Sequence, residues 1–122
     1  MSTYSGLWID HRRAFVVMIV GKVVSTHTIE SHAEAHVRHT GGSPEDTTEH
    51  RIEGELDRFY DEVIERVRGA EGLLILGPGE AKGELRARLD RHKHSIRMVD
   101  IETVDKMSDS QVVTRVRKRF QH

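Results

Sequence analysis

The spacing of apolar residues changes from a strand-like to a helix-like period near the middle of the chain. The first third holds three strand-length runs, Tyr4–Asp10, Ala14–Val20 and Val23–Glu30, separated by short polar segments. The second run is continuously apolar and β-branched, as in a strand covered on both faces. Short turns such as Gly21-Lys22 between the runs predict an antiparallel meander of three strands.

Helical periodicity begins after a polar segment. Apolar residues recur at steps of three and four from Ile52 to Val67, which predicts an amphipathic helix of about four turns. Thr47 or Thr48 is placed to cap its start, and Gly69 is placed to end it in a left-handed conformation.

Two further strands and two further helices alternate in the rest of the chain. Gly72–Leu76 and Ser95–Ile101 are strand-length runs with a helix between them, and Ser108 with Gln111 forms a capping box for a last helix. The order β-β-β-α-β-α-β-α predicts an α/β fold, a mixed five-stranded sheet with three helices in the order of the ribonuclease H-like fold. We expect one domain over residues 1–122.

Composition excludes several classes of protein. The formal net charge is −1, with 19 basic and 20 acidic residues, so any nucleic-acid contact needs a local basic patch. There is no cysteine, which excludes disulfides, thiolate zinc sites and a cysteine nucleophile. No apolar run approaches the ~20 residues that span a bilayer, so no membrane segment and a cytoplasmic location are predicted.

The segment between the meander and the first helix has almost nothing to bury. From Ser31 to about Thr48 it is rich in His, Gly, Ser, Thr and acidic residues. Structureless loops of this length inside compact domains are uncommon and often functional. We therefore predict a long flexible loop at residues 31–50 that contacts a partner, with Gly41 and Gly42 allowing close approach of the backbone.

Three stretches in this order carry a resemblance to a known family. They are the strand pair Leu7–Val20, the Gly-Gly loop and long helix His39–Val67, and the strand and Gly-rich turn Leu73–Leu85. Together they resemble the middle domain of the eukaryotic and archaeal class-one peptide release factors and its small bacterial relatives, the translational machinery protein family. The resemblance implies the fold and a connection to the ribosome.

The loop departs from the release factor pattern at the residue that matters for chemistry. In that family the loop reads Gly-Gly-Gln and its glutamine reaches the peptidyl transferase centre, whereas here it reads Gly41-Gly42-Ser43. Glu45 and Asp46 also add negative charge close to a tip that would enter RNA. Release chemistry is therefore not carried over, and no catalytic residue is predicted.

Contact with the ribosome, ribosomal RNA or tRNA is predicted for the loop and the start of the second helix. The residues are Arg38, His39, Gly41, Gly42, Ser43, Lys82 and Arg86. Two basic clusters, Arg86–His94 and Arg115–Arg119, would form a patch if they shared one face, which the sequence leaves open.

Other chemistry is weakly supported. His32 and His36 have an i,i+4 spacing without the rest of a zinc motif, and Asp10 stands where ribonuclease H enzymes place a metal-binding carboxylate but lacks a second acid at the end of the next strand. We predict no metal and no cofactor, and more readily a turn-forming role for Asp10.

The preferred function is a noncatalytic, translation-associated module that binds the ribosome or its RNA. One alternative is a peptidyl-tRNA hydrolase or ribosome rescue factor that acts through the Gly-Gly loop. Another is a protein-interaction module that dimerises through an exposed edge strand. The sequence favours a protein that is not an enzyme, and the peptidyl-tRNA hydrolase stays open as the alternative.

Overall fold

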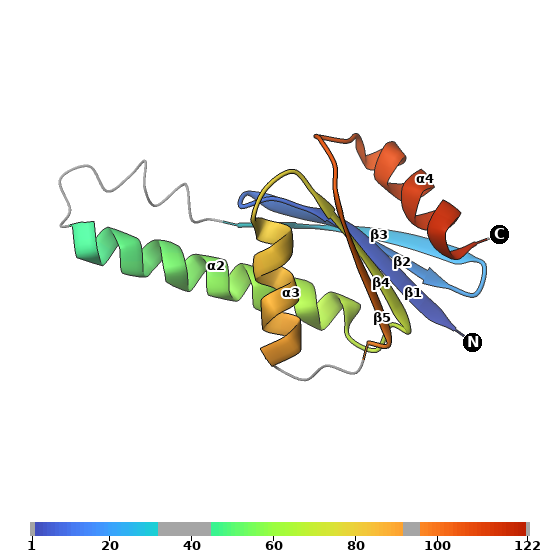
Figure 1. The fold of residues 1–122 in the computed structure, drawn as a ribbon, viewed down its shortest axis with the longest axis horizontal. Coiled ribbons are helices and arrows are strands. Elements are labelled where there is room, and N and C mark those ends of the chain that lie inside the picture. The colour runs from blue at the N-terminus through green and yellow to red at the C-terminus, as the bar shows by residue number, and fades with distance from the viewer. Residues whose placement is uncertain (1, 32–44, 92–95, 122) are drawn as a thin grey trace.

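One five-stranded sheet lies at the centre of the molecule, with helices on both of its faces (Figure 1). The computed structural model describes residues 2–31, 45–91 and 96–121, and only the backbone over residues 45–53. The strands are β1 Thr3–Ile9, β2 Arg13–Val20, β3 Val23–Glu30, β4 Gly72–Gly77 and β5 Met98–Thr103. The helices are α2 Glu45–Val67, α3 Ala81–Arg91 and α4 Asp109–Phe120.

The strands lie in the order β3-β2-β1-β4-β5. The first three form the predicted antiparallel meander, while β4 pairs parallel with both β1 and β5. The prediction of an α/β protein with a mixed five-stranded sheet and three helices is confirmed, and the arrangement is compatible with a ribonuclease H-like fold.

Two cores, one on each face of the sheet, explain the continuous apolar run of β2. On one face Leu7, Val16 and Ile75 pack against α2 and α3. On the other face Trp8 and Val17, with their neighbours, pack against Val112 and Val116 of α4. Because successive strand residues point to opposite faces, a strand covered on both sides must be apolar at every position.

The ends of two elements differ from the prediction. α2 begins at Glu45, so Thr47 and Thr48 lie inside the helix instead of capping it. Apolar periodicity marks only the part of a helix that packs on the core, and the first turns of α2 extend beyond the sheet (Figure 1). β5 begins at Met98 and not at Ser95, because its ladder starts opposite Gly72, the first residue of β4.

Two local signals in the sequence are confirmed. Gly69 has a φ of 90°, the left-handed region that favours glycine, and it follows the last residue of α2 by two positions. Ser108 caps α4 through a capping box with Gln111. None of the described helices is both long and apolar enough to cross a membrane.

Candidate functional site

The predicted contact residues of the loop lie outside the described residues. These are Arg38, His39, Gly41, Gly42 and Ser43, and their assignment stays a prediction. The histidines of the weighed metal site, His32 and His36, also lie outside the described ranges.

The other two predicted contact residues, Lys82 and Arg86, lie on α3 and have partners within the fold. The Lys82 ammonium donates to the carbonyl oxygen of Gly79. The Arg86 Nε lies 3.2 and 3.3 Å from the two carboxylate oxygens of Asp90, and its Nη1 donates to the Val99 carbonyl oxygen at 3.2 Å. Arg86 therefore ties α3 to β5.

This contact covers part of an open sheet edge. The backbone amides of Met98 and Val104 donate to residues on the β4 side, so the alternation of a strand leaves the peptide groups of Val99, Ile101 and Thr103 on the outer edge of β5. The Arg86 guanidinium donates a hydrogen bond to the Val99 carbonyl oxygen, which is one of these edge groups. Charged side chains at an edge strand oppose pairing with another chain.

The helices that carry the described residues of the two basic clusters, α3 and α4, lie on opposite faces of the sheet. Leu85 and Leu89 of α3 belong to the core shared with α2, whereas Val112 and Val116 of α4 belong to the other core. Figure 1 shows α3 and α4 on opposite sides of the strands. Arg86, Arg88 and Arg91 of α3 therefore do not share a face with the basic residues of α4.

Two arginines of the α4 cluster are paired with acids of β5. Arg115 Nη2 lies 2.7 Å from a Glu102 oxygen, and Arg119 Nη2 lies 2.6 Å from an Asp100 oxygen. All four side chains are about half exposed, and exposed pairs of this kind stabilise by ~0–1 kcal/mol. The pairs nevertheless neutralise the acids of the neighbouring strand.

Asp10, which stands where ribonuclease H enzymes place a metal-binding carboxylate, does not share a site with Asp100 of β5. Asp10 Oδ1 accepts hydrogen bonds from the backbone amides of Arg12 and Arg13 at 2.8 and 2.9 Å, so its role in forming the β1–β2 turn is confirmed. Asp100 pairs with Leu74, which pairs with Gly6. Asp100 is thus four residues, about 13 Å along the strands, short of the level of Asp10.

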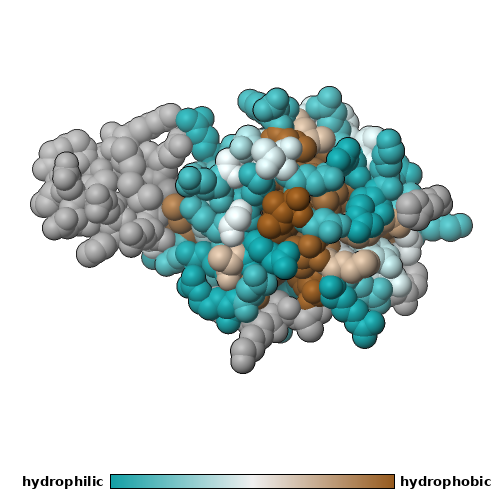
Figure 2. All heavy atoms as spheres, in the orientation of Figure 1, coloured by the Kyte–Doolittle hydropathy of each residue, from teal (hydrophilic) through white to brown (hydrophobic). Residues whose placement is uncertain are grey.

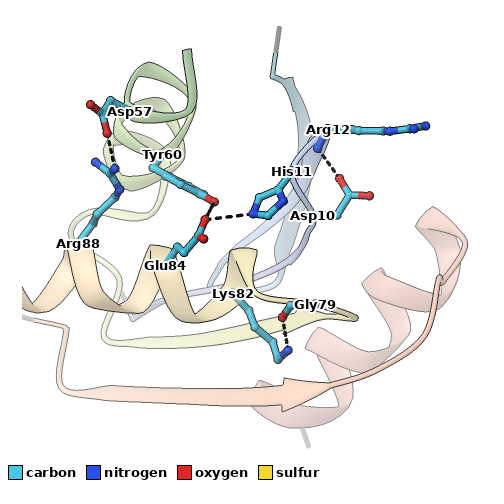
Figure 3. A network of polar contacts seen from close by, with 9 residues as sticks. All are labelled: Asp10, His11, Arg12, Asp57, Tyr60, Gly79, Lys82, Glu84 and Arg88. Atoms are coloured by element: carbon cyan, nitrogen blue, oxygen red, sulfur yellow. Dashed lines mark hydrogen bonds and ion pairs between the residues drawn. The ribbon is translucent and has the colours of Figure 1, made fainter. Parts of the chain in front are cut away.

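A polar network that the sequence did not predict joins α2, α3 and the β1–β2 turn (Figure 3). Glu84 Oε1 accepts the Tyr60 hydroxyl at 2.5 Å and lies 3.0 Å from His11 Nε2. Arg88 pairs with Asp57 and places its guanidinium 5.0 Å from the centre of the Tyr60 ring. The only signal in the sequence is that Tyr60 carries a polar atom inside an apolar stripe.

The Tyr60 phenol is held in its neutral form. Burial raises the pKa of Tyr60 well above its usual value, and the hydrogen bond to Glu84 raises it further. A phenol that keeps its proton throughout the physiological range donates hydrogen bonds and does not act as a base or a nucleophile. The network therefore serves to lock two helices to the turn.

Comparison with solved structures finds this fold as one part of larger proteins. The chain superposes on the Thermoplasma acidophilum Pelota protein with a TM-score of 0.62 and 14% identity, over 96% of this chain and 32% of Pelota. For Archaeoglobus fulgidus Pelota the TM-score is 0.60 with 15% identity, over 97% of this chain and 31% of that one. For the archaeal translation termination factor aRF1 the values are 0.56 and 16%, over 95% and 34%.

These similarities establish the fold, and the predicted resemblance to the release factors is confirmed at that level. This chain spans about a third of the length of each of these proteins. No protein-family model and no curated protein sequence matches the chain.

Proposed function

We propose that this protein is a noncatalytic, translation-associated module that binds the ribosome or its RNA. The observation that carries the proposal is the likeness of almost the whole chain to one part of Pelota and of a translation termination factor. The Gly41-Gly42-Ser43 sequence supports binding without peptide release, because serine lacks the amide of the glutamine found in release factors.

The geometry of α2 supports a role for the loop that precedes it. α2 is continuous over 23 residues, and Phe59 in its second half is buried in the core. Glu45, the first residue, is 14 positions earlier, which is about 21 Å along the helix axis. A rigid helix of this length would hold the end of the loop at a fixed distance from the sheet.

The proposed contact residues are those of the loop together with two on α3. They are Arg38, His39, Gly41, Gly42, Ser43, Lys82 and Arg86. Because Arg86 also bonds to Asp90 and Val99, Lys82 is the cleaner test on α3.

Co-sedimentation with ribosomes in a sucrose gradient tests the proposal. We expect the protein in the ribosomal fractions at low salt, and partial release as the salt concentration rises. A Gly41→Pro/Gly42→Pro variant should lose this association, and Lys82→Glu should weaken it. Gly79→Ala is the matched control, because a methyl group there meets no atom within 4 Å. Protein found only in the soluble fractions at low salt would refute the proposal.

The same ribosomes separate binding from hydrolysis. We expect peptidyl-tRNA in stalled ribosomes to stay intact when the protein is added. Release that is lost in a Gly42→Ala variant would instead establish the peptidyl-tRNA hydrolase alternative.

One observation favours the second candidate, a dimer that forms through β5. Met98 and Ile101 on this edge strand are 46% and 38% exposed, and Figure 2 shows apolar side chains grouped at the middle of the visible face. Light scattering at several concentrations tests this candidate. A dimer that becomes a monomer in Ile101→Lys would support it, and a monomer at all concentrations would exclude it.

A further inference from the structure

The outer edge of β3 has few of the features that keep an edge strand from pairing with another chain. β3 is the outermost strand on its side of the sheet and pairs only with β2 among residues 2–31, 45–91 and 96–121. Its eight residues follow β2 without a bulge, contain no proline and include one charged residue, Glu30, at the end. Natural edge strands are usually short, bulged, charged or interrupted by proline. The edge of β3 is therefore open to a further strand.

Alternate residues of β3 direct their peptide groups away from β2. The amide of Ser31 donates to the carbonyl oxygen of Arg12 at 2.8 Å, which continues the ladder between the two strands. Because the direction of the peptide groups alternates along a strand, the even-numbered residues of β3 face the outer edge. They are Val24, Thr26, Thr28 and Glu30. An extended polypeptide chain matches such a row of donors and acceptors.

A hollow of about 630 Å³ lies beside this edge, between β3 and α2. His27 and Ile29 line it from the strand, and the stretch of α2 from Arg58 to Arg66 lines it from the helix. At the other end of β3, Val23 is 69% exposed and is the most exposed large apolar side chain of the described residues. Val23 and Ile29 are an even number of positions apart, so both lie on the face that α2 covers. One strand therefore carries an exposed apolar side chain and a hollow on the same face.

Two copies of β3 are complementary in one antiparallel register. Outward-facing residues must oppose each other in such a pair, and Thr26 facing Thr26 of a second copy meets this condition about a twofold axis. In this register Val23 of each copy faces Ile29 of the other and enters the hollow beside it. Pairs of threonines and pairs of β-branched residues are favourable neighbours across two strands.

The same register matches opposite charges at the ends of the two strands. Counting outward from Thr26 places Lys22 of one copy at the level of Glu30 of the other, and the twofold axis gives this pair twice. Both side chains are exposed, and neither has an ion-pair partner among the described residues. Slipping the register by two residues in either direction separates Lys22 from Glu30 and moves Val23 away from Ile29. Charge and shape therefore select the same pairing.

We propose that β3 is the contact of a twofold symmetric dimer of this protein, in which the two five-stranded sheets join edge to edge. The proposal goes beyond the translation-associated function and does not depend on it. It uses the edge of the sheet opposite to β5, so it differs from a dimer through β5 in the substitutions that should disrupt it.

Sedimentation velocity of the parent protein and of Thr26→Pro tests the proposal. The Thr26 amide points outward, so proline at this position removes the central hydrogen bonds between the two copies and none of those to β2. We expect a dimer for the parent protein and a monomer for Thr26→Pro. Thr26→Val is the matched control, because it keeps the amide and the β-branched shape, and it should stay a dimer.

The charge pair gives a second test that does not rely on a proline variant. Lys22→Glu and Glu30→Lys each place like charges opposite one another at both ends of the contact, so each should weaken the dimer about tenfold. Lys22→Glu/Glu30→Lys in one chain restores opposite charges and should recover the affinity of the parent protein. Arg91→Glu is the control, because it reverses an exposed charge on α3, away from β3.

The outcomes separate this contact from the other candidates. Loss of the dimer in Thr26→Pro, with recovery of the affinity in the double charge reversal, supports the proposal. A parent protein that is a monomer at every concentration overturns it, as does a dimer that survives Thr26→Pro. A dimer that is lost in Ile101→Lys also overturns it and assigns the contact to β5. A double reversal that stays as weak as the single variants overturns the register.

Discussion

Tyr60 on α2 and Glu84 on α3 are joined by a hydrogen bond of 2.5 Å between the phenol oxygen and Oε1. The Tyr60 ring is buried in the core, while the Glu84 carboxylate is 41% exposed and also contacts His11. The bond therefore fixes two helices and the β1–β2 turn at one atom, at the boundary between core and solvent.

Tyr60→Phe should lower the free energy of unfolding by about 1–2 kcal/mol. The ring still fills its place in the core, so the loss reflects the hydrogen bond to a charged group, reduced by the partial exposure of Glu84. Urea unfolding at neutral pH measures it, with an unchanged m-value. Tyr4→Phe is the control, because the Tyr4 hydroxyl has no hydrogen-bond partner among the described residues, and it should stay within about 0.5 kcal/mol of the parent.

The raised pKa of Tyr60 should make the protein less stable in alkali. The folded state keeps the phenol proton above pH 10, where the unfolded state loses it. The contribution of Tyr60 to the free energy of unfolding is therefore fully present below about pH 10 and falls as pH rises. This one group contributes a slope of about 1.4 kcal/mol per pH unit. Unfolding of the parent and of Tyr60→Phe between pH 9 and 11.5 measures the difference. Parallel curves for the two proteins would contradict the expectation.

Gly6 is required because β1 and α4 approach closely. A methyl group at Gly6 would overlap the side chain of Val116, which is fully buried. Gly6→Ala should therefore cost about 1–3 kcal/mol by overpacking. Thermal unfolding measures the loss. Val116→Ala should lower the stability of the Gly6→Ala variant by less than it lowers the stability of the parent protein.

Gly83→Ala is the matched control for this prediction. Gly83 is an exposed helical residue with no atom within 4 Å of the added methyl group. The Gly83→Ala substitution should stabilise the protein by about 0.5–1 kcal/mol, because alanine has the higher helix propensity. A loss of stability in Gly83→Ala would contradict the expectation that only Gly6 lacks room for a methyl group.

Asp10 should behave as a turn residue. Asp10→Ala removes the acceptor of two backbone amides and should cost about 1–2 kcal/mol, whereas Asp10→Asn keeps an oxygen in place and should cost less. Urea unfolding measures both. Magnesium-dependent cleavage of RNA by the parent protein that is lost in Asp10→Asn would contradict the turn assignment and indicate that Asp10 binds a metal ion.

Prediction from the sequence succeeded where the signal is local. The period of apolar residues gave β2 as a strand covered on two faces, and the capping box at Ser108 and the left-handed Gly69 were found at the expected positions. It was wrong at the start of α2, where the helix extends beyond the core and no apolar stripe marks it.

The polar network could not be found in this way. His11 and Glu84 are 73 residues apart and Tyr60 and Glu84 are 24 apart, so no spacing rule connects them. The same holds for the hydrogen bond between Arg86 and Val99. It depends on β5 being the edge strand next to β4, and the strand order is known only from the structure.

By itself, the sequence determined the order of strands and helices along the chain and the burial of β2 on both faces, because each is a property of neighbouring residues. The tertiary structure alone decided that α3 and α4, with their described basic residues, lie on opposite faces of the sheet. The physical reason is the path of the chain. α3 connects the parallel strands β4 and β5 over one face of the sheet, and α4 follows β5 and packs on the other face.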